Sequence, residues 1–143
     1  MNRWDIKAKA YVLFKRGNEI LVNEVREKDG VLKGYRIPGG HVEFFEHSRD
    51  TAAREIMEEL GAEVKELRLL KVLENRFTYF GNQGHEIIFV YEAAFVDGAF
   101  YQQNVIMAHE DADNTSFELF WLDPYKRPEG TEIYPIGLLE ILS

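Results

Sequence analysis

The chain has 143 residues, of which 45% are hydrophobic and 29% charged, and its formal net charge is −8. This length favours one compact domain over residues 1–143, and the composition excludes a disordered protein. The acidic surplus argues against a long nucleic acid as partner, because such binding needs clustered Lys and Arg. The sequence contains no cysteine, which excludes disulfides and thiolate metal sites.

The apolar stretches of the sequence are short. A run such as residues 87–90 cannot cross a bilayer, which takes about 20 apolar residues. The first residues, MNRWDIKAKAYVLF, interrupt every apolar stretch with charges and lack the apolar core of a signal peptide. We therefore expect a cytoplasmic protein with no membrane partner. The sequence leaves the oligomeric state open, and a homodimer is one of the alternatives.

The first third of the chain has the pattern of strands and loops. Residues 6–15 alternate between apolar and polar side chains, which predicts a strand with one buried face. A turn signal at residues 15–18 precedes a second strand pattern at residues 19–25, so we expect these two strands to form a hairpin. A polar loop over residues 26–33 and a short extended piece over residues 34–40 follow.

A helix is predicted over Ser48–Leu60. Ser48 is a suitable N-cap, and Gly61 stands where a helix commonly ends in a left-handed residue. Four apolar residues have the spacing of one buried stripe, namely Ala53, Ile56, Met57 and Leu60.

Strands dominate the second half of the chain. Residues 64–80 and 86–96 have the pattern of two long strands, joined by a turn at residues 81–84. An acidic loop is expected at residues 108–114, a strand at residues 117–122 and a short helix at residues 134–142. This order of elements predicts an α/β (α+β) fold, in which helices pack against a mixed β-sheet.

The segment GGHVEFFEHSRDTAAREIMEELGA, residues 39–62, carries the candidate chemistry. Glu55, Glu58 and Glu59 are spaced i, i+3 and i+4, so their carboxylates project from one helix face and repel one another. A hard cation such as Mg²⁺ removes this repulsion, because it binds carboxylate oxygens. Arg54 can reach back to Glu46 through two parallel hydrogen bonds and hold the preceding loop against the helix.

A structural explanation competes with this interpretation. Charged helix faces are usually just solvated, and for three clustered glutamates alone that explanation has a weight of roughly 80%. The complete pattern adds Gly40, Glu46, Arg54 and Gly61 at fixed offsets. Chance produces such a match with a frequency on the order of 10⁻⁶ to 10⁻⁵, given ordinary residue usage.

The pattern Gly40-x5-Glu46-x7-Arg54-Glu55-Ile56-x-Glu58-Glu59-Leu60-Gly61-Ala62 resembles the signature box of the Nudix (MutT-like) hydrolases. The resemblance implies an α/β/α sandwich around a mixed sheet, with the box forming a loop, a helix and a second loop. It also implies a hydrolase in which water attacks phosphorus. The substrate is then a nucleoside diphosphate linked to another group, cleaved at its diphosphate bond.

The same resemblance implies roles for individual residues. Glu55, Glu58 and Glu59 would bind Mg²⁺, with Mn²⁺ as an alternative, and the carbonyl of Gly39 would complete the metal site. Arg54 and Glu46 would orient the metal ligands. The catalytic base would be Glu55 within the box or Glu110 in the acidic loop, although a solvated loop carboxylate is the commoner case.

Two positions depart from the family pattern. Ala62 closes the box where a larger aliphatic residue is usual, which affects packing only. Phe45 replaces a glycine that is often found before Glu46. Because a bulky side chain disfavours a positive φ, we expect the loop to run differently or Phe45 to pack against a partner.

The sequence says less about the substrate. Arg36 and Arg26 are candidates for phosphate contacts, or else solvated surface residues. Tyr79 stands at the spacing of a tyrosine found in some Nudix dinucleoside polyphosphate hydrolases, although aromatic residues in strands more often belong to the core. ADP-ribose, nucleotide sugars and nucleoside triphosphates stay open.

A different class of protein is a Nudix module that binds or senses a nucleotide metabolite without cleaving it. Such modules typically have lost box glutamates, whereas the box of this chain is intact. The histidines of the chain do not form a paired metal motif either.

Overall fold

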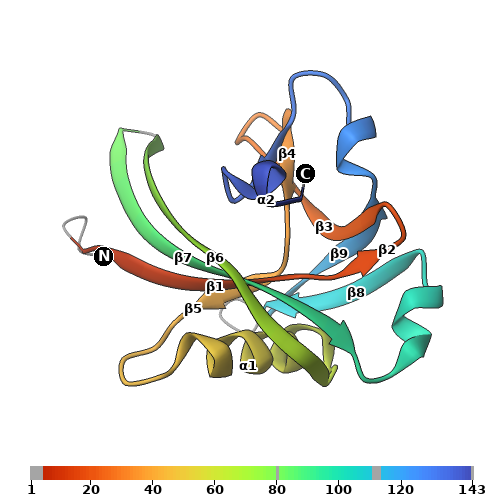
Figure 1. Cartoon of the computed structure of the whole chain (residues 1–143). Helices are drawn as coiled ribbons and strands as arrows, with labels where there is room; N and C mark the ends of the chain where they lie inside the picture. The colour runs from red at the N-terminus through yellow and green to blue at the C-terminus, as the bar shows by residue number, and fades with distance from the viewer. Residues whose placement is uncertain (1–4, 80, 111–113, 143) are drawn as a thin grey trace.

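The computed structural model describes residues 5–79, 81–110 and 114–142, and its strands form two sheets (Figure 1). The first sheet has four strands in the order β5 (Gly39–His41), β1 (Lys7–Leu13), β7 (Asn82–Phe95) and β6 (Val64–Tyr79). Strand β1 runs parallel to β7 and antiparallel to β5. The sheet is therefore mixed, as predicted.

The second sheet has six strands. Its main path is β10 (Glu132–Tyr134), β4 (Leu32–Arg36), β3 (Glu19–Arg26), β9 (Thr115–Leu122) and β8 (Val105–Glu110). The short strand β2 (Lys15–Arg16) pairs with β3. Two 3₁₀ helices, Gly98–Gln102 and Pro124–Lys126, lie in the connections before β8 and after β9.

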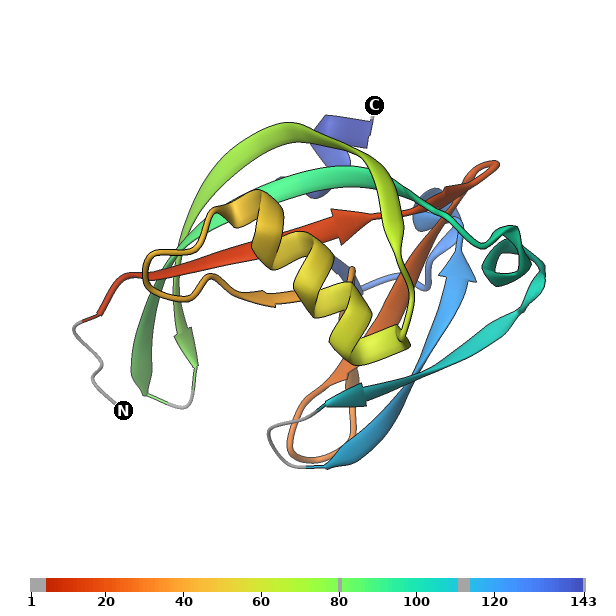
Figure 2. The same ribbon diagram turned by 90° about the horizontal axis from the view of Figure 1, so that it is seen from below.

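Helices cover both sides of the four-stranded sheet. Helix α1 (Ser48–Leu60) crosses one side, and the short helix α2 (Leu138–Leu142) lies on the other (Figures 1 and 2). A separate apolar core lies on each side: one includes Val12, Ile56 and Phe95, and the other includes Leu13, Val90 and Leu138. The predicted α/β/α sandwich is confirmed. Within the described ranges, no helix has the length and apolar character needed to span a membrane.

The predicted hairpin between the first two strands is correct only next to its turn, and wrong for the rest of the first strand. Strand β1 pairs with β5 and β7, and only the two residues of β2 pair with β3. The chain passes from one sheet to the other at Phe14, whose carbonyl accepts a bond from Leu21 N–H at 3.2 Å. Because β1 is central and covered on both sides, Leu13 is as deeply buried as Val12, and Tyr11 is also buried. The predicted single buried face is therefore also wrong.

Helix α1 has the predicted bounds and end. Gly61 has φ 66°, and its N–H donates to the carbonyl of Met57 at 2.8 Å. The N-cap is His47 rather than Ser48, whose hydroxyl bonds the Tyr91 hydroxyl at 2.7 Å. The predicted apolar stripe is wrong in part, because Met57 is exposed. The buried residues of α1 are instead Thr51, Ala52, Ile56 and Glu59.

The predictions for the second half are correct for three strands. The two long strands exist as β6 and β7, and β9 contains the strand predicted at residues 117–122. Residues 108–110 of the predicted acidic loop instead belong to β8, and residues 111–113 lie outside the described residues. The predicted C-terminal helix begins late, at Leu138, because Tyr134 belongs to β10 and Pro135 follows it.

Candidate active site

The candidate site is built where strand β5 meets helix α1. Gly40 lies opposite Ala10 of β1, and Gly39 lies opposite Tyr11. A Cβ atom at Gly39 would collide with the carbonyl of Ala10 and the ring of Tyr11. A Cβ atom at Gly40 would collide with the carboxyl group of Glu55. Gly39 requires glycine, because a Cβ atom there would collide with backbone atoms of β1, whereas at Gly40 a Cβ atom would displace the Glu55 carboxyl group.

Glu55 and Glu59 form a pair of carboxyl groups on the inner face of α1. Glu59 is only 6% exposed. Burial raises the pKa of Glu59 to about 9, and the hydrogen bond and negative charge of Glu55 add to the shift. Burial also raises the pKa of Glu55. A bond between two carboxyl groups requires a proton, so this pair holds one near neutral pH without a cation.

Arg54 links the loop to the helix, as the sequence predicts. Its guanidinium contacts Glu46 through Nε at 2.8 Å and through Nη2 at 3.0 Å. Its Nη1 donates to Glu55 at 2.8 Å and to Glu58 at 3.2 Å. Nη2 also donates to the carbonyl of His41 at 3.1 Å. One side chain therefore positions the loop, strand β5 and the carboxyl group of Glu55 together.

Glu46 organises the loop before the helix. The bond from Arg54, followed by the bond from Thr51, lowers the pKa of Glu46 to about 2. The Thr51 hydroxyl donates to Glu46 Oε1 at 2.7 Å, and the backbone N–H of Glu43 donates to the same oxygen at 3.1 Å. Thr51 was missed by the sequence analysis. A hydroxyl residue in the first turn, five positions after a loop glutamate, is the signal that could have identified it.

Glu58 does not join the other two glutamates. Its side chain is 41% exposed and contacts Arg54 on the outer side of the helix. Across the described ranges, no three His, Cys, Asp or Glu side chains are gathered in a set that could hold a metal ion. A buried and a half-buried carboxyl group that share a proton nevertheless fit a hard divalent cation, because its charge would replace that proton. Gly39, whose carbonyl is a candidate metal ligand, directly precedes Gly40, which lies against the Glu55 carboxyl group.

Two other predicted residues lie within electrostatic reach of this pair. Glu110, exposed at the end of β8, raises the pKa of Glu59, whereas the positive charge of Arg36 on β4 lowers it. Both effects are smaller than that of burial. The structure thus brings the candidate base and one candidate phosphate ligand toward the glutamates.

The other two candidate substrate-binding residues, Arg26 and Tyr79, are not placed at this site by the described structure. Arg26 is held by its own turn, where it donates to Glu24 at 3.0 Å and to the carbonyl of Gly30 at 2.8 Å. Its position therefore has a structural explanation, and we do not retain it as a phosphate ligand. Tyr79 is the last residue of β6, and its side chain lies outside the described part of the chain.

A charged group beside the site was also missed. Lys9 of β1 forms an ion pair with Glu86 of β7 at 2.7 Å, with both side chains mostly buried. Lys9 also acts on His41, whose pKa is lowered first by burial and then by Lys9 and Lys7. The sequence presents Lys9 as an ordinary polar position of a strand. Only the pairing of β1 with both β5 and β7 places its charge next to the box.

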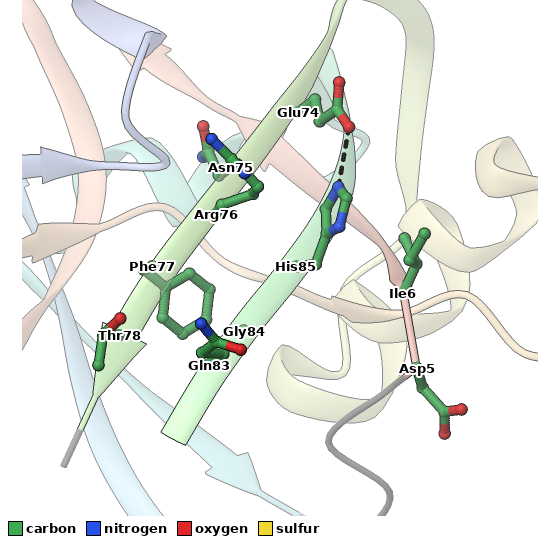
Figure 3. Close-up of a pocket in the computed structure, with 10 residues that line it drawn as sticks. All are labelled: Asp5, Ile6, Glu74, Asn75, Arg76, Phe77, Thr78, Gln83, Gly84 and His85. Carbon is green, nitrogen blue, oxygen red and sulfur yellow. Dashed lines mark hydrogen bonds and ion pairs between the residues drawn. The ribbon is translucent and has the colours of Figure 1, made fainter. Parts of the chain in front are cut away.

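Figure 3 shows a pocket of about 640 Å³ on the β6–β7 hairpin. Its described lining includes Glu74, Arg76, Phe77 and His85, but none of the glutamates of α1. A smaller pocket of about 370 Å³ lies over β3 and β9 and is lined in part by Arg26. Chemistry therefore assigns the candidate site to the Glu55–Glu59 pair rather than to the larger hollow.

The model of the NUDIX domain matches residues 6–131 of the chain. The chain belongs to the Nudix family. This match confirms the predicted family and hydrolase class, and the fold agrees with solved Nudix structures. It does not distinguish among substrates.

Three of the similar solved structures cover nearly the whole chain. A MutT Nudix hydrolase from Burkholderia pseudomallei is 21% identical, with a TM-score of 0.70 over 97% of this chain and 99% of its own. The E. coli ORF135 protein is 23% identical, with a TM-score of 0.56 over 96% of this chain and 89% of its own. A third structure, a UDP-X diphosphatase, is 21% identical, with a TM-score of 0.64 over 96% of this chain and 61% of its own.

Proposed function

We propose that this Nudix protein is a divalent-metal-dependent hydrolase that cleaves the diphosphate bond of a nucleoside diphosphate linked to another group. One observation carries the proposal. Glu59 is buried beside Glu55, and the two carboxyl groups share a hydrogen bond next to the Gly39–Gly40 backbone. A helix whose only task was packing would gain nothing from burying this acidic pair.

The pair explains why the activity would need a cation. Mg²⁺, or Mn²⁺ in its place, would be held by Glu55 and Glu59, with the Gly39 carbonyl and Glu58 as further candidate ligands. When bound, such a cation neutralises charge on phosphate oxygens and makes water a better nucleophile. To bind the cation, the Glu58 side chain would have to turn from Arg54 toward Glu55 and Glu59.

The remaining residues would position the ligands and the substrate. Arg54 and Glu46 hold the Glu55 carboxyl group in place through paired hydrogen bonds. Arg36 is the candidate contact for a substrate phosphate, because its positive charge already acts on Glu59. Glu55 and Glu110 are the candidates for the base that accepts a proton from the attacking water.

Several classes of substrate fit this reaction. The similar structures include one described as a UDP-X diphosphatase, which supports testing nucleotide sugars. Dinucleoside polyphosphates, ADP-ribose and nucleoside triphosphates share the same diphosphate linkage. We propose that one of these small molecules is the substrate.

The test is a turnover assay on this panel with Mg²⁺ or Mn²⁺, in which chromatography resolves the products. We expect cleavage that EDTA abolishes and added metal restores. Calorimetric titration of Mg²⁺ into the protein supplies a second readout, because binding should release protons from the Glu55–Glu59 pair.

Each other result has a defined meaning. Turnover that persists in EDTA would contradict the metal requirement. Tight metal-dependent binding of one compound without turnover would instead favour a sensing module.

A further inference from the structure

The outer edge of strand β6 is covered by helix α1 near its start and, among the described residues, is unpaired farther along. Near its start, Arg49 of α1 donates to the carbonyl of Leu67 at 2.8 Å, so the helix covers this part. From Lys71 to Tyr79 the strand pairs with β7 without interruption. Leu73 still packs against one core, and the far part of the hairpin projects from the body of the protein (Figures 1 and 2). In the described ranges, no strand pairs with its other side.

This projecting edge has the composition of a strand that can pair. It contains no proline and exposes two apolar side chains, Val72 at 45% and Phe77 at 46%. Free backbone groups along such an edge are a template for another strand. The residues that would meet a second strand therefore decide which partner fits.

A second copy of the chain would meet this edge under a simple constraint. If the two-fold axis is perpendicular to the sheet, the strands run antiparallel and opposite residues point to the same face. The axis must then lie midway between one residue and the same residue of the second copy. With the axis at Asn75, Glu74 lies opposite Arg76 of the second copy, and the same pair recurs on the other side of the axis.

Neighbouring registers lack this match. An axis at residue 73 puts Glu74 opposite Val72, an axis at residue 74 puts Arg76 opposite Val72, and an axis at residue 76 puts Glu74 opposite Thr78. Only the register through Asn75 joins opposite charges, and it also places Leu73 opposite Phe77. Opposite charges and apolar pairs directly across two strands both stabilise a sheet.

We infer that a second copy of this chain pairs with β6, in an antiparallel register centred on Asn75, and forms a continuous eight-stranded sheet. Glu74 already bonds His85 through Oε2 at 2.8 Å, and the incoming guanidinium would contact its other oxygen (Figure 3). The described lining of the pocket that contains Glu74 and Arg76 includes neither Glu55 nor Glu59, so the interface is separate from that pair. The dimer can therefore be tested independently of the proposed hydrolase activity.

Charged side chains on an edge strand can also prevent pairing. Charge reversals separate this alternative from the dimer. In Glu74→Arg both members of each pair are positive, and in Arg76→Glu both are negative. A mixture of the two variants restores opposite charges at both pairs.

The experiment is analytical ultracentrifugation and native mass spectrometry of the full chain and both variants. We expect a wild-type dimer, self-association at least about tenfold weaker in each single variant, and a heterodimer when the variants are mixed. Lys65→Glu reverses an exposed charge on the first part of β6 and should leave the dimer unchanged. Circular dichroism checks that every variant is folded.

Three results would each overturn the proposal. The first is a wild-type protein that stays monomeric up to about 200 µM, a range that would reveal even weak pairing. The second is a dimer that neither single variant weakens. The third is a mixture of folded variants that forms no heterodimer.

Discussion

The carboxyl group of Glu55 lies in the space that a side chain at residue 40 would fill. A Cβ atom built on Gly40 would collide with Oε1 and the carboxyl carbon of Glu55, not with backbone atoms. The glycine of strand β5 and the glutamate of helix α1 are therefore required together. This relationship separates a requirement of the site from a requirement of the fold.

We expect Gly40→Ala to lower kcat by about a hundredfold, because displacing a reacting group by about 1 Å has an effect of that size. The melting temperature should change little, since the flexible Glu55 side chain can move aside. Gly98→Ala is the matched control, because a Cβ atom there meets nothing within 4 Å. A Gly40→Ala variant that loses its fold, or that keeps full activity, would contradict this account.

Replacing Glu59 by Gln tests the metal ligand itself. The change removes a negative charge and keeps the volume, so we expect the rate to fall at least about a hundredfold. Stability without metal should be nearly unchanged, because the buried carboxyl group is protonated near neutral pH in that state. The exposed Glu63→Gln variant is the control, and the measurements are metal-dependent turnover and thermal unfolding. Near-wild-type turnover by Glu59→Gln would refute the assignment.

Much of the site could be predicted from the sequence because its parts have fixed spacing along one helix. The i, i+3, i+4 spacing of the glutamates and the reach of Arg54 to Glu46 are properties of helix geometry. The structure contains that helix over Ser48–Leu60 and the predicted Arg54–Glu46 contact. Local periodicity was sufficient for these features.

The rest depends on contacts between distant segments. Glu59 is buried and Glu58 is exposed because of where α1 sits on the sheet, which helical spacing alone does not reveal. The alternating pattern of residues 6–15 and 19–25 suits a hairpin equally well, but β1 pairs with β7, more than seventy residues later. Strand pairing over such separations cannot be deduced from local pattern.

Stability should depend on pH through Glu46. Its pKa is lowered from 4.5 to about 2 by Arg54 and Thr51, so the ionised form is stabilised by folding. This contribution is complete above the unfolded pKa and is lost as pH falls from about 4.5 toward 2, and it amounts to about 3 kcal/mol at most. Urea unfolding of wild type and Glu46→Gln should therefore differ at pH 7 and converge near pH 2.

Glu43→Gln is the control for this prediction. Glu43 also contacts Arg54, at 3.5 Å, but its side chain is 64% exposed. An exposed pair of this kind contributes less than about 1 kcal/mol. A Glu43 variant as unstable as the Glu46 variant would show that loss of charge near Arg54, rather than the Glu46 bonds, controls stability.

The loop before α1 adopts the backbone conformation that the sequence disfavours. Phe45 has φ 69°, so the expectation that its bulk would prevent a positive φ is wrong. Its side chain is 97% exposed and that of Phe44 is 99% exposed. The bonds of Glu46 to Arg54, Thr51 and the Glu43 N–H hold the chain on either side and outweigh the local strain.

We expect Phe45→Gly to raise the free energy of unfolding by about 0.5–1 kcal/mol, because glycine adopts the left-handed conformation without strain and little buried surface is lost. Phe44→Gly should instead lower it by a similar amount, since Phe44 does not have a positive φ and glycine only loosens the unfolded chain. Thermal and urea unfolding of both variants measure the difference. If the two substitutions destabilise the protein equally, the left-handed conformation at Phe45 carries no strain, and the bonds of Glu46 do not have to overcome any.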